Sequence, residues 1–383
     1  MPHSGTAAAF ERVAAWLTYC ATHHVGCKPP GDGKFLPKRL LDVRPVGDTG
    51  EKVPDLIRLI ESGTGQQREA TVPYAALSYC WGADMTGIIT TTTLNLSAHS
   101  QGVPLKTLPK SIADAVAVCR GINIRYLWVD ALCILQDDTD DWRTESSQMA
   151  AIYINSEVTI AAHTAASCQD GFLGEQSYGQ PAWQRAFTTK FWPRGTRTLN
   201  FGQHPSQVKM FLRPGLTPDD NTTDDQLSRL MCRGWALQES LLPRRIIHYT
   251  GSEMAWECAS RCICECGHVE QSQDFTTLLK TRVLRGGSWQ NNSSEATWMR
   301  LVEEYTKRKL SRQSDKLVAL SGLAKFILAD AGDVGFAPPS NAKYKTNTVQ
   351  GDQGKAWPGG DGQLCLSRRH ISFRPSWAPF VVY

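Results

Sequence analysis

The chain has 383 residues, of which 41% are hydrophobic and 20% are charged, and this balance excludes an intrinsically disordered protein. Lys and Arg number 41 against 37 Asp and Glu, which gives a net charge of +4; because both signs are scattered along the chain, no nucleic-acid partner is expected. No apolar run is long enough to span a membrane and no signal-peptide pattern opens the chain, which predicts a soluble, cytoplasmic protein without a transmembrane segment.

Residues 1–72 are predicted to form a lead-in to the main domain. Apolar residues between Phe10 and Leu17 recur at helical spacing, and the turn-rich segment 29–34 ends this helix. Short extended segments over 39–44 and 56–61 are predicted to follow it.

The core domain is predicted over residues 73–260, where short apolar runs alternate with helical patterns. The runs expected to be buried strands are 74–81, 125–129 and 158–162. Such alternation favours an α/β fold, with a mostly parallel sheet flanked by helices. In that architecture sites form in the loops after the carboxyl ends of strands, which is where residues 130–141 fall.

Two helices are predicted to connect these strands. The first covers residues 110–119, where apolar side chains share one helical face, with Ser111 as its cap and Gly121 at its end. The second spans residues 142–153, whose apolar positions again follow helical spacing.

The carboxyl-terminal half is predicted to add strands and helices to this core. It opens with a polar, turn-rich stretch over 169–228 that is typical of a loop insertion. The later segments are a helix over 233–242, strands over 245–249 and 253–257, a Cys-rich segment with two amphipathic helices over 261–330, and an irregular, disordered or truncated tail over 331–383.

The loop after the second predicted strand gathers groups able to do acid–base chemistry. Asp130, Cys133 and Gln136 lie in it, and Glu145 follows on the next helix. A carboxylate at a strand end can act as a general base or bind a ribose hydroxyl. The structural alternative is that Asp130 caps a turn, Cys133 is a core residue, and residues 137–141 form the acidic first turn of a helix.

The predicted helix over 233–242 carries a second polar group. Arg233 and Glu239 are six residues apart, so they cannot pair along one helix, and either side chain can face a pocket. The alternative is an ordinary helix whose Trp235 packs inward while Gln238 and Glu239 bond to local backbone.

The sequence SYCWG at residues 78–82 presents Ser78 and Cys80 as possible nucleophiles. A nucleophile needs an adjacent base, and no His follows nearby in the sequence. A Gly after an apolar run is typical of a strand and its tight turn, which favours a structural role for this segment.

Cysteines and histidines cluster in two places, which makes a structural zinc site one of two interpretations, although neither cluster has the paired C-x2-C knuckles typical of such sites. The chain has twelve cysteines, too few for a disulfide scaffold, and in a reducing compartment most are expected to be free thiols or metal ligands. A structural zinc ion takes four Cys or His ligands. The alternative is buried free cysteines with surface histidines. The candidate ligands are Cys20, His23, His24 and Cys27, which share one face of the first predicted helix, and Cys258, Cys262, Cys264, Cys266 and His268.

Several motifs in order along the chain together resemble the fungal heterokaryon incompatibility (HET) domain. The resemblance covers roughly residues 16 to 328. The motifs that carry it are YAALSYCWG at 74–82, LPKSIADAVAVC at 108–119, YLWVDALCILQ at 126–136, DWRTESSQMAAIY at 141–153 and RGWALQESLLP at 233–243. Their marker residues are Ser78, Tyr79, Trp81, Gly82, Trp128, Asp130, Cys133, Gln136, Trp142, Arg233, Trp235, Gln238 and Glu239.

The resemblance implies a protein that triggers programmed cell death after non-self recognition, through protein partners and with a homo-oligomer as one form of assembly. HET domains are thought to be distantly similar to TIR domains, some of which cleave NAD with a catalytic Glu. By that analogy Glu145 and Glu239 are candidate catalytic residues and NAD is a candidate substrate, while Asp130 is a candidate because of its position at a strand end. A third interpretation is a zinc-stabilised interaction scaffold.

The carboxyl end departs from the family pattern. Family members usually continue with a YLAGLW-like segment and an SWSWAS-like strand, and here only residues 375–378 resemble that pattern. We therefore expect a divergent, truncated or mis-spliced end.

Overall fold

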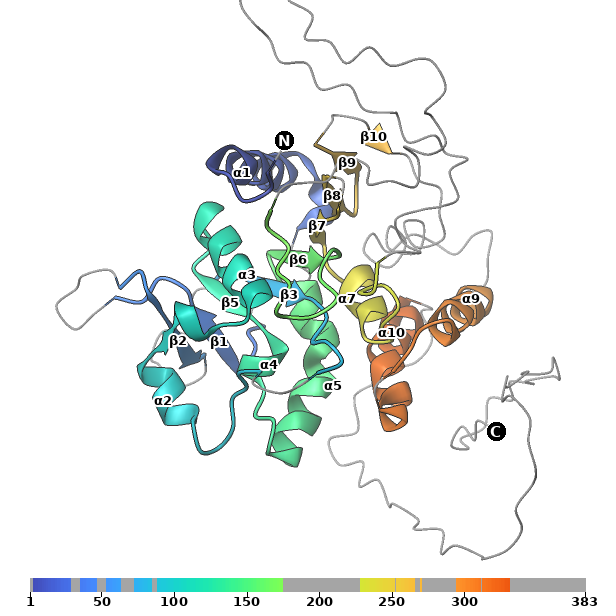
Figure 1. The fold of residues 1–383 in the computed structure, drawn as a ribbon. Helices are drawn as coiled ribbons and strands as arrows, with labels where there is room; N and C mark the ends of the chain where they lie inside the picture. The colour runs from blue at the N-terminus through green and yellow to red at the C-terminus, as the bar shows by residue number, and fades with distance from the viewer. Residues whose placement is uncertain are drawn as a thin grey trace, which may run out of the picture. The chain divides into compact units, whose positions relative to one another are not determined.

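The computed structural model of the protein is built on one mixed β-sheet with helices packed against it. Among the described residues, ten strands join in the order β10-β9-β8-β7-β6-β3-β5-β1-β2-β4 (Figure 1). These residues all belong to one unit, residues 1–335. The structure describes residues 3–28, 35–46, 53–62, 72–84, 88–174, 228–251, 253–265, 269–270, 294–310 and 312–330.

Four parallel strands form the centre of the sheet: β5 (Tyr126–Trp128), β3 (Tyr74–Ser78), β6 (Val158–Ala162) and β7 (Arg245–Tyr249). Every residue of β3 and β6 is buried. Strands covered on both faces read as continuous apolar runs rather than as alternating ones, which is why the sequence revealed them. The predicted α/β fold with parallel central strands is confirmed.

Antiparallel strands extend the sheet on both sides of this centre. Residues 250–253 join β7 to β8, and residues 259–261 join β8 to β9; connections this short permit only antiparallel pairing. The added strands are β1 (Arg39–Asp42), β2 (Leu56–Glu61), β4 (Val103–Pro104), β8 (Met254–Cys258), β9 (Cys262–Cys264) and β10 (Val269–Glu270).

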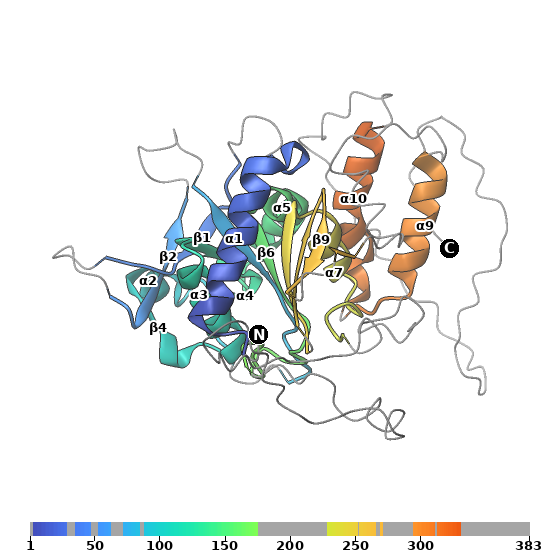
Figure 2. The same cartoon turned by 90° about the horizontal axis from the view of Figure 1, so that it is seen from above.

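Helices on opposite faces cover the central strands. α3 (Lys110–Gly121) leads from β3 to β5, and α5 (Thr139–Asn155) leads from β5 back across to β6, on the other side of β3. Because such crossovers are right-handed, the two helices must lie on opposite faces. α1 (Ala7–His23) packs on α3 and β8, and α10 (Lys316–Asp330) packs on α5 (Figure 2).

The remaining helices are short or lie beside these. α9 packs along α10, and α7 contacts both α5 and α10. Their bounds, with those of the 3-10 turns, are η1 (Val25–Cys27), α2 (Leu96–Gln101), η2 (Leu105–Thr107), α4 (Asp130–Cys133), α7 (Ala236–Leu241), α9 (Ser294–Thr306) and η4 (Gln313–Asp315).

Two details differ from the sequence-based expectations. The cap position of α3 is Pro109, and the Ser111 hydroxyl instead donates to the Ser167 carbonyl oxygen at 3.4 Å. The helix expected over 233–242 starts only at Ala236, because Arg233 forms a β-bridge with Lys309 and the backbone N–H of Gly234 donates to the Lys309 carbonyl oxygen. Most of the predicted insertion and all of the predicted tail lie outside the described residues.

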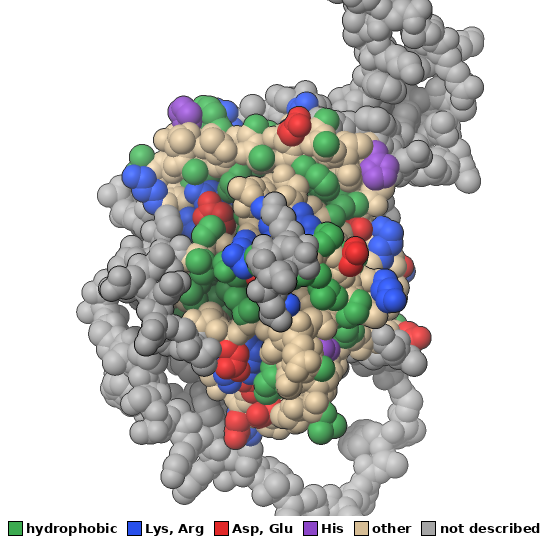
Figure 3. All heavy atoms as spheres, turned by 90° about the vertical axis from the view of Figure 1, so that its left-hand side faces the viewer, with side chains coloured by type: hydrophobic (Ala, Val, Ile, Leu, Met, Phe, Trp, Pro, Cys, Tyr) green, Lys and Arg blue, Asp and Glu red, His purple; other side chains and the backbone are tan. Residues whose placement is uncertain are grey.

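Charges of both signs are interspersed on the face that carries β1, β2 and α2. Figure 3 shows Lys and Arg side chains there beside Asp and Glu rather than gathered in one patch of the described surface. Leu94 is an exposed apolar side chain, with 94% of its surface accessible.

The central strands predict where the fold is sensitive to substitution. Ile160 lies on β6 with no exposed surface, so Ile160→Ala removes buried apolar area and leaves a cavity. We expect the free energy of unfolding to fall by about 2 to 5 kcal/mol in urea denaturation. Leu94→Ala is the matched control, with an expected change within about 0.5 kcal/mol. Equal losses in the two variants would contradict the assignment of the core.

Candidate functional site

A buried polar group lies where the central parallel strands end. Ser78 is the last residue of β3, and its hydroxyl donates to Oε2 of Glu239 on α7 at 2.5 Å. Both side chains are buried, at 3% and 4% exposure. The structure therefore brings a carboxylate base against a serine hydroxyl, which the search for a nearby His in the sequence missed.

Arg233 and Asp130 belong to the same group, which we call the strand-end group: Ser78, Asp130, Arg233 and Glu239. Asp130 follows β5 and accepts a hydrogen bond from the indole N–H of Trp81 at 2.9 Å. Arg233 donates to the carbonyl oxygen of Tyr79, directly after β3. Arg233 and Asp130 are both half-buried, so the group reaches from the interior toward solvent.

Burial and charge oppose each other in the strand-end group. Burial raises the pKa of Glu239, and the Arg233 guanidinium and the Ser78 hydroxyl only partly offset that rise. Burial also raises the pKa of Asp130, although Arg233 and the Trp81 N–H favour its ionised form. Carboxyl groups with raised pKa values beside a fixed cation are suited to general acid–base chemistry.

Cys80 is poorly suited to act as a nucleophile. Its thiol is buried at 5% exposure, and burial raises its pKa, which disfavours the reactive thiolate. The turn after it needs Gly82, whose φ of +103° favours glycine and whose Cβ would lie 2.7 Å from the Ser167 hydroxyl oxygen. The structural interpretation of this turn therefore fits Cys80 and Gly82, whereas the hydroxyl of Ser78 has a carboxylate partner in Glu239.

Glu145 lies in a different environment on α5. Its side chain has no exposed surface, and neither carboxylate oxygen accepts a hydrogen bond within the described part of the chain. Burial and the neighbouring Asp141 charge raise the pKa of Glu145, while Arg39 and Lys38 act against that rise. Glu145 is therefore an isolated buried acid beside an ion pair.

That ion pair joins the start of β1 to the first turn of α5. Arg39 is 1% exposed, and its Nη2 lies 2.5 Å from Oδ1 of Asp141. Asp141 also accepts from Lys38 at 2.6 Å and from the backbone N–H of Leu135 at 2.9 Å. A carboxylate with this many donors is held ionised inside the protein.

The acidic segment 137–141 has the structural role that the sequence offered as an alternative to catalysis, at the start of α5. Asp138 is the N-cap, and its Oδ1 accepts from the backbone N–H groups of Asp140 and Asp141 at 2.9 and 3.0 Å. The Asp137 carboxylate accepts hydrogen bonds from the backbone N–H and from the hydroxyl of Thr93. These carboxylates satisfy orphan donors in the loop and at the helix start.

The other family markers hold the strand ends in place. Cys133 is fully buried, and burial raises its pKa to about 12; Gln136 donates to the carbonyl oxygen of Asp130 at 3.1 Å. Gln238 on α7 donates to the carbonyl oxygen of Ala319 on α10. Trp128 is fully buried, Tyr79 is buried, and Trp142 and Trp235 are half-buried against the core.

A hydrogen-bonded relay on the neighbouring strands was not anticipated from the sequence. The Ser228 hydroxyl lies 2.9 Å from Nδ1 of His163, whose Nε2 lies 2.9 Å from Nδ1 of His248; His248 in turn lies 2.9 Å from Glu257. Burial and the adjacent His248 lower the pKa of His163 to about 3, so this imidazole is neutral. Ser228, His163 and His248 are far apart in the sequence, and the pairing of β6 with β7 and of β7 with β8 brings His163, His248 and Glu257 together.

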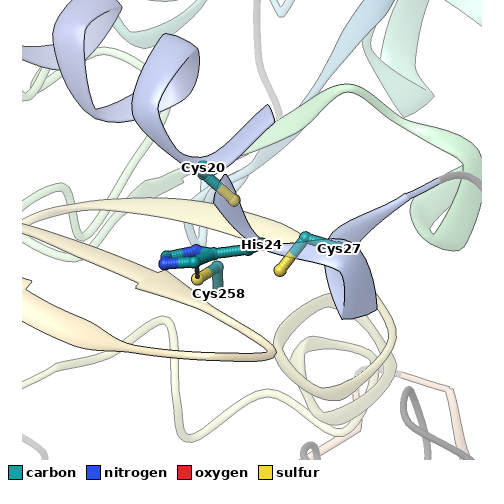
Figure 4. A group of neighbouring side chains, drawn as sticks. All are labelled: Cys20, His24, Cys27 and Cys258. Atoms are coloured by element: carbon teal, nitrogen blue, oxygen red, sulfur yellow. Dashed lines mark hydrogen bonds between the residues drawn. The ribbon is translucent and has the colours of Figure 1, made fainter. Parts of the chain in front are cut away.

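Four of the predicted metal ligands converge between α1 and β8 (Figure 4). One ligand atom each of Cys20, His24, Cys27 and Cys258 lies within 4.8 Å of the others, and we call these residues the Cys/His cluster. Nδ1 of His24 is 3.4 Å from Sγ of Cys258. The three thiols are buried, free cysteines.

The helical-spacing argument for these ligands was wrong in its geometry. α1 ends at His23, and Cys27 reaches the Cys/His cluster from the separate turn η1. His23 points elsewhere: it stacks on Tyr19 with ring centroids 4.1 Å apart. Cys262 lies outside the cluster, Cys264 is disulfide-bonded, and Cys266 and His268 fall outside the described residues.

Comparison with known families identifies the segment that contains the strand-end group. Residues 74–239 match the family described as heterokaryon incompatibility protein (HET). This segment of the chain is therefore similar to HET domains. The HET match starts at the first residue of β3 and ends at Glu239, so it includes all four residues of the strand-end group. No curated protein and no solved structure matches the chain significantly.

None of the helices described for this HET-domain protein is long and apolar enough to cross a membrane.

The ion pair predicts an acid-dependent loss of stability. Burial disfavours ionised Asp141, but hydrogen bonds from Arg39 and Lys38 outweigh it and lower the pKa from 3.8 to about 2. A depressed pKa stabilises the folded state above the unfolded value, and that stabilisation of about 2 kcal/mol disappears as pH falls toward 2. Urea titrations should show the advantage of the intact chain over Asp141→Asn shrinking from pH 5 to pH 2. A pH-independent difference would contradict the ion pair.

Glu145→Gln should show the opposite pH trend. A raised pKa means that the folded state resists ionisation, so stability is present below the unfolded pKa and is lost as pH rises through the folded one. The variant is expected to be more stable than the intact chain at pH 8, with a smaller difference at pH 4, in the same urea titrations. Destabilisation at pH 8 would mean that the carboxylate has a partner in solution.

Proposed function

We propose that this HET-domain protein is an effector of heterokaryon incompatibility that triggers programmed cell death after non-self recognition, in the cytoplasm of a filamentous fungus. The HET match over 74–239 supports this proposal. The two ends of that segment meet in the hydrogen bond between Ser78 and Glu239, so the segment closes on one polar group. The trigger is a protein partner, and self-association of the chain is one route to the active form.

A second candidate function is cleavage of NAD at the strand-end group. Glu239 and Asp130 lie at the carboxyl ends of parallel strands, the place where α/β proteins bind nucleotides. The analogy with TIR domains names Glu145 equally, but Glu145 has only the buried ion pair beside it. The observation that favours Glu239 is its pairing with a hydroxyl donor and a nearby cation, Arg233.

The reaction in this proposal is hydrolysis at C1′ of the nicotinamide ribose. The bond between C1′ and the nicotinamide nitrogen breaks, and its electron pair leaves with nicotinamide. Water supplies the new bond to C1′, and its proton passes to a carboxylate and then to solvent. The products are ADP-ribose, nicotinamide and a proton. Glu239 is the proposed base, Asp130 is positioned for a ribose hydroxyl, and Arg233 supplies positive charge for the phosphates.

Inducible expression in a filamentous fungus tests both proposals together. The variants are Glu239→Gln, which keeps the size of the side chain, and Glu145→Gln as a matched buried-carboxylate control. We expect the intact chain and Glu145→Gln to cause cell death together with loss of cellular NAD. In Glu239→Gln, the rate of NAD loss and the extent of cell death should both fall at least about 100-fold, the usual contribution of a general base. Limited proteolysis checks that each chain is folded.

The outcomes separate the two functions. Death without NAD loss would contradict the enzymatic candidate and leave an effector that acts through assembly. Loss of death in Glu145→Gln but not in Glu239→Gln would show that the active carboxylate has been misassigned. An intact chain that accumulates in folded form, with no death in any incompatible background, would contradict the effector proposal itself.

A further inference from the structure

The Cys/His cluster lies outside the HET match and has no part in the strand-end group. Cys20, His24 and Cys27 precede residue 74, and Cys258 follows residue 239. We propose that these four residues bind one structural Zn²⁺ ion, which fastens the amino-terminal helix α1 to strand β8. This proposal is independent of whether the protein kills cells or cleaves NAD.

The ligand atoms have the spacing that a tetrahedral zinc site needs. Zn–S bonds of about 2.3 Å at tetrahedral angles place neighbouring sulfurs about 3.8 Å apart. The four ligand atoms all lie within 4.8 Å of one another, and the His24 Nδ1 to Cys258 Sγ distance is 3.4 Å. Figure 4 shows the three sulfurs and the imidazole turned toward a common centre. Small side-chain adjustments would complete the tetrahedron.

The chemistry of the ligand set selects zinc over the common hard cations. Three thiolates and one imidazole are soft to borderline ligands, whereas Ca²⁺ and Mg²⁺ take oxygen ligands. Four protein ligands close the coordination sphere, which is the pattern of a structural rather than a catalytic zinc site. The three thiols are also unoxidised, as ligation requires.

Two buried arginines around the Cys/His cluster provide the outer interactions of a metal site. Nε of Arg245 donates to Sγ of Cys20 at 3.3 Å. Nη1 of Arg244 and Nη2 of Arg245 both donate to the carbonyl oxygen of Cys27, at 2.8 and 3.1 Å, and so fix the η1 turn. Three thiolates around Zn²⁺ leave one net negative charge, which the adjacent guanidinium groups offset. Such outer interactions orient ligands and tune metal affinity.

A zinc ion in the Cys/His cluster would fasten α1 and the η1 turn to β8. The contacts of α1 with the sheet include the Arg245–Cys20 hydrogen bond, a tilted contact between Trp16 and Trp256, and a hydrogen bond from Arg12 to the Glu265 carbonyl oxygen at 2.9 Å. Zinc would add bonds from both the end of α1 and the η1 turn to β8. It would thereby lock together the segments that precede and follow the HET match.

Metal analysis of the full-length chain tests the proposal. The protein is expressed with zinc in the medium, purified under reducing conditions and analysed by mass spectrometry of the metals. We expect one zinc per chain, which a chelator removes with a lowered unfolding temperature. After chelation, Co²⁺ alone should restore the unfolding temperature and give the visible absorption of a tetrahedral, thiolate-ligated ion.

Matched variants locate the site. His24→Ala and Cys258→Ser should retain zinc at least about tenfold more weakly against a chelator, because each loses a ligand. The controls are their neighbours His23→Ala and Cys262→Ser, which should hold zinc like the intact chain. If a ligand variant fails to fold, the Co²⁺ spectrum of the intact chain still decides. A folded intact chain without stoichiometric zinc and without that spectrum, or with two of the three cysteines joined in a disulfide, would overturn the proposal.

Discussion

Burial of the central strands on both faces is the constraint on which the rest of this protein depends. β3 and β6 have no exposed residue, so most of their side chains are apolar, and the polar side chain of Ser78 stands at the very end of β3. The first hydroxyl after the apolar run of β3 is Ser78, and the first carboxylate after β5 is Asp130. The same burial that builds the core therefore concentrates the candidate chemistry at one edge.

Buried arginines join strands to helices and turns that are distant in the sequence. Arg39 ties β1 to α5 through Asp141, and Arg244 ties β7 to the η1 turn through the Cys27 carbonyl oxygen. Arg233 joins the segment before α7 to the end of β3 through the Tyr79 carbonyl oxygen. A guanidinium stays charged when buried and offers several donors, so one side chain can satisfy carbonyl and carboxylate oxygens from distant segments. The strand-end group and the Cys/His cluster both adjoin such an arginine.

The strand-end group and the Cys/His cluster differ in their position and in their chemistry. The strand-end group lies within the HET match and contains the raised-pKa carboxyls and the serine suited to chemistry. The Cys/His cluster lies outside the match, at the junction of the first helix with β8, and contains ligands suited to holding parts together. If zinc closes that junction, oxidation or chelation would loosen the flanks of the HET domain without altering the strand-end group.

The sequence by itself determined the central strands, the helices between them and the resemblance to HET domains. Continuous apolar runs predicted β3, β5 and β6, helical periodicity predicted α3 and α5, and ordered motifs predicted the HET family, because all of these are local patterns. The tertiary structure alone decided which polar residues meet. It paired Ser78 with Glu239, left Glu145 isolated, and placed His24 rather than His23 beside the three thiols of the Cys/His cluster, because α1 ends at His23. Contacts between residues more than 150 positions apart depend on strand order and crossover direction, and no local spacing contains that information.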